Sequence, residues 1–210
     1  MAELWKQLRY STHVMFHPFD GFWDLKHEHR GSVKAAMVLL AMLVLNSIIK
    51  TQFTGFLYNP YYDGVSLNVF SELTSVVGTF FLWCISNWSL TTLMDGEGRF
   101  SDIVMVSAYA LVPMFLIGIP LTFLSNVMPL DYAAFYNIVL SFTYIWAGFL
   151  MLAGLMVVHQ YTLGKTLLSA ILIIVGMAVI VFLGLLFFNL ISQLVGFVVE
   201  LYWEISLRFF

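Results

Sequence analysis

The sequence is poor in charge. Its 9 Lys and Arg and 12 Asp and Glu make up 10% of 210 residues, whereas soluble domains have about 25%. Apolar residues reach 61% and the mean hydropathy is +0.91, more than a globule of this size can bury away from water. This composition excludes a soluble enzyme and a disordered tail. The formal net charge of −3 also excludes a nucleic-acid-binding protein, which needs a surplus of Lys and Arg.

Metal-binding and disulfide-forming residues are few. The single cysteine, Cys84, excludes a disulfide framework or a cysteine-built zinc site within one chain. His13 and His17 have a spacing that suits a shared metal, but Pro18 disfavours helical geometry at His17, so headgroup or loop contacts are favoured. His159 ends an apolar run, where we expect it to cap a helix or to face water.

Catalytic patterns are missing as well. The sequence has no Gly-x-Ser-x-Gly elbow, no His-Glu-x-x-His and no glycine-rich phosphate loop. Its apolar runs contain no ionisable residue of the kind that marks a proton or ion path in a membrane. We therefore expect no catalytic residue, no cofactor and no metal, and a protein that is not an enzyme.

Long uncharged runs are what the sequence does have. A helix needs about 20 apolar residues to cross the hydrocarbon core, and the chain supplies five such stretches, the first of them flanked by lysines that can snorkel to the headgroups. The predicted fold is all-α: an integral membrane bundle of five transmembrane helices. The expected spans are residues 32–53, 73–94, 103–125, 132–158 and 166–199.

The distribution of Lys and Arg predicts the orientation, because short cytoplasmic loops hold the excess of both residues. A cytoplasmic N-terminus leaves only Lys50 and Arg208 on the outside. We thus predict a multi-pass protein of the cell membrane with its C-terminus outside. The residues collected on the cytoplasmic side are Lys6, Arg9, Lys26, Arg30, Lys34, Arg99 and Lys165.

Three parts of the chain are expected to differ in role. Residues 1–31 form a cytoplasmic lead in which aromatic residues alternate with cations, which is typical of an interfacial anchor and also suits a docking surface for a cytoplasmic partner. Residues 32–189 form the five-span domain. Residues 190–210 are predicted to be an amphipathic helix outside the membrane, lying on the lipid or against another protein. Its apolar face comprises Phe197, Leu201, Tyr202, Ile205 and Phe209.

Local features within the spans point to packing. Pro113 and Pro120 predict kinks in the third span. Residues 95–99 (DGEGR) predict a tight turn between two spans. Small residues in the last two spans predict close helix contacts; these are Ala147, Gly148, Ala153, Gly154, Gly176 and Gly184.

Four segments together resemble the Yip domain family of Ypt/Rab-GTPase-interacting membrane proteins, in its bacterial form. They are residues 17–26 (HPFDGFWDLK), 95–102 (DGEGRFSD), 109–113 (YALVP) and 159–165 (HQYTLGK). The resemblance implies five spans with the N-terminus inside, and structural or docking positions without catalysis. Those positions are Asp20, Trp23, Asp24, Gly96, Arg99, Tyr109 and Pro113.

The resemblance also frames the functional hypotheses. Eukaryotic members resemble adaptors that recruit small GTPases, but this chain lacks their long Pro/Gln-rich tail, so GTPase recruitment is not carried over. Bacterial members resemble companions of solute importers. The favoured hypothesis is a non-enzymatic adaptor or accessory subunit bound to the bilayer and to other membrane proteins, such as ABC transporter permease subunits, or to copies of itself. The alternative is a transporter or channel for a small solute or ion.

Overall fold

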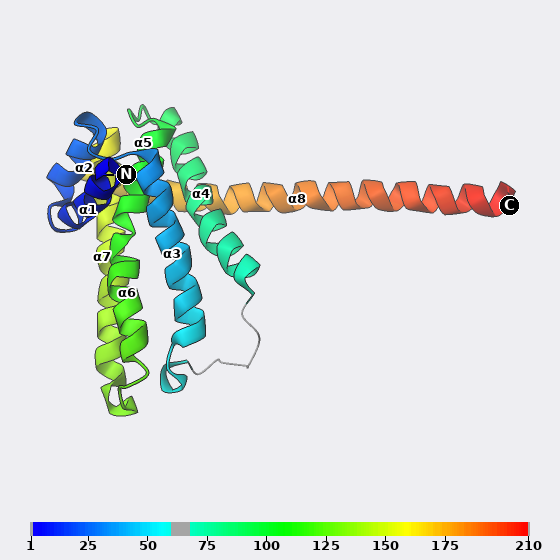
Figure 1. Cartoon of the computed structure of the whole chain (residues 1–210). Helices are drawn as coiled ribbons and strands as arrows, with labels where there is room; N and C mark the ends of the chain where they lie inside the picture. Colours follow the sequence, from blue (N-terminus) through cyan, green and yellow to red (C-terminus); the bar gives the residue numbers. More distant parts are fainter. Residues whose placement is uncertain (1, 60–67, 210) are drawn as a thin grey trace.

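The computed structural model describes residues 2–59 and 68–209 and shows an all-helical chain (Figure 1). No strand occurs in these two ranges. Two short 3-10 turns, Phe56–Tyr58 and Leu130–Tyr132, accompany the α-helices. The α-helices are α1 (Ala2–Phe16), α2 (Pro18–His27), α3 (Val33–Phe53), α4 (Val69–Leu93), α5 (Phe100–Ala110), α6 (Val112–Leu124), α7 (Ala133–His159) and α8 (Leu163–Phe209).

Five helical stretches are long and apolar enough to cross a membrane, which confirms the predicted five-span fold. The first two begin at polar caps: Ser32 Oγ accepts the Ala35 N–H at α3, and Asn68 Oδ1 accepts the Ser71 N–H at α4. Such caps satisfy amides that a helix start leaves unpaired. The third stretch consists of α5 and α6 together.

The third span is interrupted near Pro113, as the sequence predicts. Pro113 has no N–H for the carbonyl of Tyr109, so α5 ends at Ala110 and α6 restarts at Val112 with Pro113 in its first turn. Pro120 lies inside α6, which continues to Leu124. Only the first proline therefore ends a helix.

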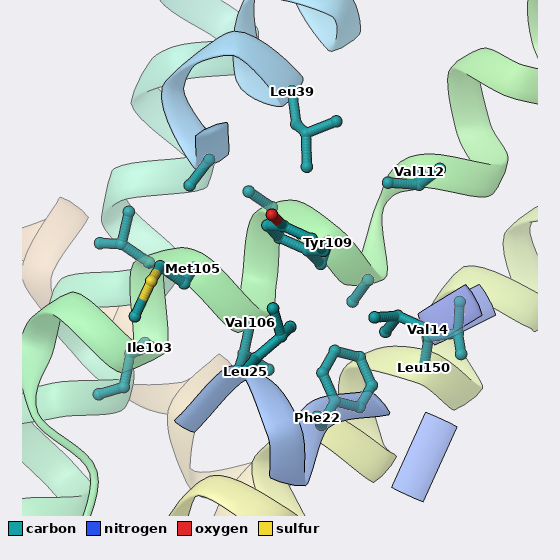
Figure 2. Close-up of a cluster of buried hydrophobic side chains, with 14 of the residues drawn as sticks. Val14, Phe22, Leu25, Leu39, Ile103, Met105, Val106, Tyr109, Val112 and Leu150 are labelled. Carbon is teal, nitrogen blue, oxygen red and sulfur yellow. The ribbon is translucent and has the colours of Figure 1, made fainter. Parts of the chain in front are cut away.

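The core surrounds α5, in which every residue from Ile103 to Ala110 is buried. Helices α1 and α2 contribute to it: Val14 and Phe22 are 0% exposed. The lead is thus part of the packed bundle, a role that its alternating aromatic and basic residues did not indicate. Figure 2 shows the cluster, with Val14, Phe22, Leu25, Leu39, Ile103, Met105, Val106, Tyr109, Val112 and Leu150 labelled.

The outward side of the lead keeps large aromatic rings exposed. Trp5 and Trp23 are 71% and 49% exposed, and Phe16 and Phe19 are exposed as well. Gly21 lets α1 and α2 approach, since a Cβ there would lie 2.8 Å from Val14 Cα. The lead therefore has an inner apolar face in the core and an outer aromatic face that is free for lipid or protein.

Small residues mediate close packing only at some of the predicted positions. Ala147 and Ala153 are buried, Gly154 lies against Val106, and Gly176 faces Ser86 Oγ and Leu90 of α4. For Gly148 and Gly184 the prediction of close contacts within the chain is wrong, because a Cβ on either would meet no atom of the described residues within 4 Å. The sole cysteine, Cys84, is 0% exposed inside α4.

Helix α8 contacts the bundle only near its beginning. Ser86 Oγ of α4 donates to the Ile173 carbonyl at 2.7 Å, and Ile173 and Ser169 are completely buried. Beyond this contact α8 runs sideways out of the bundle and does not lie alongside α3, α6 and α7 (Figure 1). All residues from Leu185 to Glu204 are exposed.

Candidate functional site at the junction of three loops

Three of the four segments singled out in the sequence meet at one end of the bundle. They come from α2, from the α4–α5 connection and from the α7–α8 connection, which Figure 1 shows at the same end as the N-terminus. Lys26 joins all three, because its Nζ donates to the Val158 carbonyl at 2.9 Å and lies 3.6 Å from Glu97 Oε2. We call residues 26, 94–99 and 158–161 the loop junction.

His159 lies inside the loop junction and is only 2% exposed. The expectation that it faces water is wrong, because residues 94–99 fold over its ring. The Gly98 N–H donates to His159 Nδ1 at 3.3 Å, so the neutral imidazole carries its proton on Nε2. That nitrogen has no partner among the described residues, and neither has Asn87 Oδ1. Both side chains line the same small void between α4 and α7.

The two glycines of the loop junction are required by its close packing. A Cβ on Gly96 would lie 2.6 Å from His159 Nδ1 and 2.7 Å from the Tyr161 hydroxyl, and a Cβ on Gly98 would lie 2.5 Å from Val158 Cγ1. Asp95 has φ 56° in the predicted tight turn, which is confirmed. The glycines therefore allow the α4–α5 connection to contact the α7–α8 connection.

Tyr161 closes the loop junction from the other side. Its hydroxyl donates to the Met94 carbonyl at 3.1 Å, and Lys165 Nζ lies 4.3 Å from the centre of its ring. Burial, and then the charge of Asp95, raise the pKa of Tyr161, which keeps the hydroxyl protonated and able to donate. The end of α4 is thereby tied to the start of α8.

The residues predicted as structural or docking positions divide into two groups. Asp24 accepts the Tyr10 hydroxyl at 2.7 Å, the Tyr109 hydroxyl donates to the Gln7 carbonyl at 3.2 Å, and Gly96 and Pro113 are enclosed by neighbours. These four hold the lead, the loops and the broken span together. The remaining positions, Asp20, Trp23 and Arg99, are exposed at the surface.

The central residues of the loop junction were not among the positions predicted from the sequence. Lys26, Gly98 and Tyr161 all lie within the quoted segments, but nothing in their spacing indicates that they touch.

Within the described ranges no three His, Cys, Asp or Glu side chains are grouped as a metal site requires. His13 and His17 stack their rings at 4.8 Å.

A second feature is a cavity of about 400 Å³ among the membrane helices. Its wall is contributed by α3, α4, α7, α8 and the break between α5 and α6, where Leu111 and Met114 lie. None of its lining side chains is ionisable at neutral pH. The hydroxyl and amide groups that line it belong to Asn46, Ser47, Ser75, Thr79 and Tyr144.

The loop junction brings together three of the four segments on which the resemblance to the Yip domain family rests, and the comparison with family models agrees with this resemblance. A family model described as the Yip1 domain matches residues 12–186. The chain belongs to the Yip1 domain family. No curated protein and no solved structure matches it. The Yip1 domain match begins within α1 and ends within α8 at residue 186, so it includes α2 and stops where the exposed part of α8 begins.

Proposed function

We propose that this Yip1 domain protein is a non-enzymatic membrane adaptor or accessory subunit that binds other integral membrane proteins. The observation that supports this most directly is the exposed stretch of α8, residues 185–204. Large apolar side chains are exposed along it, as Phe187, Phe188 and Leu194 are 60%, 70% and 58% exposed. Phe197, Leu201 and Tyr202 of the predicted partner face are exposed to a similar degree.

The length of α8 supports a protein partner in addition to lipid. Its 47 residues extend about 70 Å at about 1.5 Å per residue, whereas the hydrocarbon core is about 30 Å thick. Because α8 runs sideways out of the bundle (Figure 1), the other helices leave its apolar surface uncovered, and large exposed apolar patches mark interaction sites. The chemistry of this surface fits another apolar membrane helix, and the permease subunits of ABC-type importers are the partners to test first.

The proposed orientation has the loop junction in the cytoplasm of the cell. Seven of the 9 Lys and Arg residues belong to the lead, the start of α3, the α4–α5 connection or the start of α8, and Lys50 is near the opposite end of α3. This excess is what the positive-inside rule associates with the cytoplasmic face. The exposed aromatic residues of the lead, with Asp20 and Arg99, would then face the cytoplasm or the inner headgroups.

Photocrosslinking in native membranes tests the adaptor. A photoreactive residue at Trp203, which is 60% exposed, or at Trp23 is expected to yield adducts with another membrane protein, identified by mass spectrometry. The matched control is the same residue at Phe80, which is 5% exposed and should give only intrachain adducts. Adducts confined to lipid at Trp203 and Trp23 would contradict the proposal.

The second candidate function is a transporter or channel, and the cavity beside the broken third span favours it, because interrupted helices often line substrate paths. Reconstitution of the purified chain into liposomes, with flux of ions and small solutes as the readout, separates the two functions. An adaptor gives no flux by itself. Flux that disappears when the cavity is filled by Val76→Phe would establish the transporter instead.

A further inference from the structure

The cavity among the membrane helices has an uncharged interior. Its apolar wall includes Leu43, Val76, Trp83, Met114, Met151 and Met177. Three of these are methionines, whose flexible side chains adapt to irregular apolar occupants. The volume of about 400 Å³ falls within the range of about 300–1,000 Å³ that is typical of ligand sites. An interior of this kind accepts a hydrocarbon chain and rejects a charge.

Two ionised residues lie beside this cavity, each bonded to a residue that lines it. Lys50 Nζ donates to the Tyr144 hydroxyl at 2.9 Å. Glu72 Oε2 accepts the Ser47 hydroxyl at 2.6 Å, and its other oxygen accepts the Thr51 hydroxyl at 3.1 Å. Of the residues that the structure describes, Lys50 therefore places a cation and Glu72 an anion at the rim of the cavity.

These rim charges do not neutralise each other. Among the described residues, neither Lys50 nor Glu72 has an ion-pair partner within 4.0 Å, although both are half-buried. A charge-assisted hydrogen bond to a group of opposite sign is stronger than a hydrogen bond between neutral groups, so each of these charges is suited to such a partner. Such a partner would carry a negative group for Lys50 and a positive group for Glu72.

The position of the rim matches the depth of lipid headgroups. Lys50 is in the last turn of α3, and Glu72 is in the first turn of α4, so both lie at the end of a membrane-spanning helix. The cavity extends from there toward Trp83 and Met151, deeper in the bundle. A molecule with a zwitterionic head and an apolar tail would satisfy both regions at once.

We propose that the cavity is a binding site for one zwitterionic phospholipid of the phosphatidylethanolamine class. One acyl chain occupies the cavity, the phosphate pairs with Lys50, and the ammonium donates to Glu72. An ethanolamine head is preferred to choline because its primary ammonium has N–H donors for the carboxylate, as a lysine ammonium does. This site lies apart from the exposed stretch of α8 and is independent of the adaptor proposal.

The first test measures which lipid stays with the protein. The full chain is reconstituted in nanodiscs of equal parts phosphatidylethanolamine, phosphatidylcholine and phosphatidylglycerol, extracted into mild detergent, and analysed for retained lipid by native mass spectrometry. We expect a single bound phosphatidylethanolamine per chain. Retained lipid that simply mirrors the nanodisc composition would overturn the proposal, and so would preferential retention of phosphatidylglycerol.

Rim variants test the assigned contacts. Glu72→Gln removes the charge-assisted hydrogen bond to the ammonium, so it should lower the preference for phosphatidylethanolamine about tenfold. Lys50→Gln removes the contact with the phosphate, which all three lipids carry, so it should lower the amount of retained phospholipid about tenfold. Lys34→Gln is the matched control, because Lys34 is exposed at the other end of α3. Thermal unfolding shows whether each variant is folded. A folded Glu72→Gln protein that keeps the wild-type preference, or a folded Lys50→Gln protein that retains as much phospholipid as wild type, would contradict the assignment of the headgroup.

The depth of the acyl chain is tested with brominated lipids, which quench tryptophan fluorescence on contact. Trp83 lines the cavity, and the difference between wild type and Trp83→Phe isolates its emission from that of the other tryptophans. Brominated phosphatidylethanolamine should quench Trp83 more strongly than brominated phosphatidylglycerol, and Val76→Phe should abolish this difference. Equal quenching by the two lipids would refute a selective site.

Discussion

The third span and α8 differ in a way that hydropathy alone does not predict. In the most hydrophobic part of Phe100–Leu124 the mean hydropathy is 2.1 and 61% of residues are buried inside the protein, whereas in α8 the values are 3.2 and 6%. The more apolar helix is the less buried one. In a membrane, an apolar helix is one whose side chains face lipid. Contacts between helices depend instead on small and hydrogen-bonding residues, such as Ser107 and Ala108 in α5.

The strongest test of this contrast replaces one phenylalanine in each region by alanine. Phe22 is 0% exposed against α5, and Phe188 on α8 is 70% exposed. Phe22→Ala should lower the free energy of unfolding by about 3–5 kcal/mol because it leaves a cavity. Phe188→Ala should change it by less than about 0.5 kcal/mol. Denaturant unfolding in the same micelles measures both, and equal losses would remove the distinction between the two regions.

A pair of glycine substitutions sharpens the contrast. Gly98→Ala places a methyl group 2.5 Å from Val158 Cγ1, and such overpacking costs about 1–3 kcal/mol. Gly184→Ala on α8 meets nothing within 4 Å and should stabilise the helix by up to about 1 kcal/mol through its higher helix propensity. Opposite shifts in melting temperature are therefore expected. A stable Gly98→Ala protein would show that the loop junction is looser than described.

Removing the polar contacts of the loop junction is expected to have a smaller effect on the free energy of unfolding. Lys26→Met removes the hydrogen bond to the Val158 carbonyl and the ion pair with Glu97, for a loss of about 1.5 kcal/mol in the free energy of unfolding. Lys34→Met is the control, since Lys34 is exposed, and it should stay within about 0.5 kcal/mol of wild type. Equal unfolding curves for the two variants would mean that Lys26 does not stabilise the junction.

The smallest expected effect concerns pH and the attachment of the lead. Burial, followed by the neighbouring Asp24 carboxylate, raises the pKa of Tyr10. The folded state therefore favours the protonated Tyr10 hydroxyl. The stabilisation that this hydroxyl gives the folded state is complete below the ordinary tyrosine pKa of about 10. It is lost as the pH rises through the raised pKa of Tyr10. The stability difference between wild type and Tyr10→Phe should shrink at high pH, as measured by unfolding at several pH values. An unchanged difference would contradict the contact, and Tyr202→Phe serves as the exposed control.

The membrane spans could be predicted from the sequence because each one depends only on the composition of its own segment. A run of uncharged residues must leave water wherever it lies in the fold, so five runs predicted five membrane helices, and the missing amide of Pro113 predicted a break. The absence of proline between Lys165 and Phe210 is equally local, and it agrees with the uninterrupted helix α8. Properties that a segment carries by itself can be inferred without knowing its neighbours.

The loop junction could not be predicted in this way, because it depends on contacts between distant residues. His159 follows an apolar run and so suggested a water-facing end, but its surroundings are set by Gly98, about 60 positions earlier in the chain. Gly148 and Gly154 are chemically identical, yet only Gly154 has a neighbour opposite it. Residues 1–31 suggested an interfacial anchor because their aromatic residues alternate with cations, and this pattern does not indicate which of the aromatic residues, such as Phe22, are buried in the core.

The shielding of Cys84 has a practical consequence for establishing topology. Its thiol is the only one in the chain and is completely enclosed in α4, so membrane-impermeant maleimides should leave the folded native protein unlabelled. A cysteine introduced at an exposed position of any connection then becomes a unique reporter of the compartment it faces. The native protein therefore gives no labelling signal of its own. The side of the membrane that each connection faces can be determined in intact cells without first replacing Cys84.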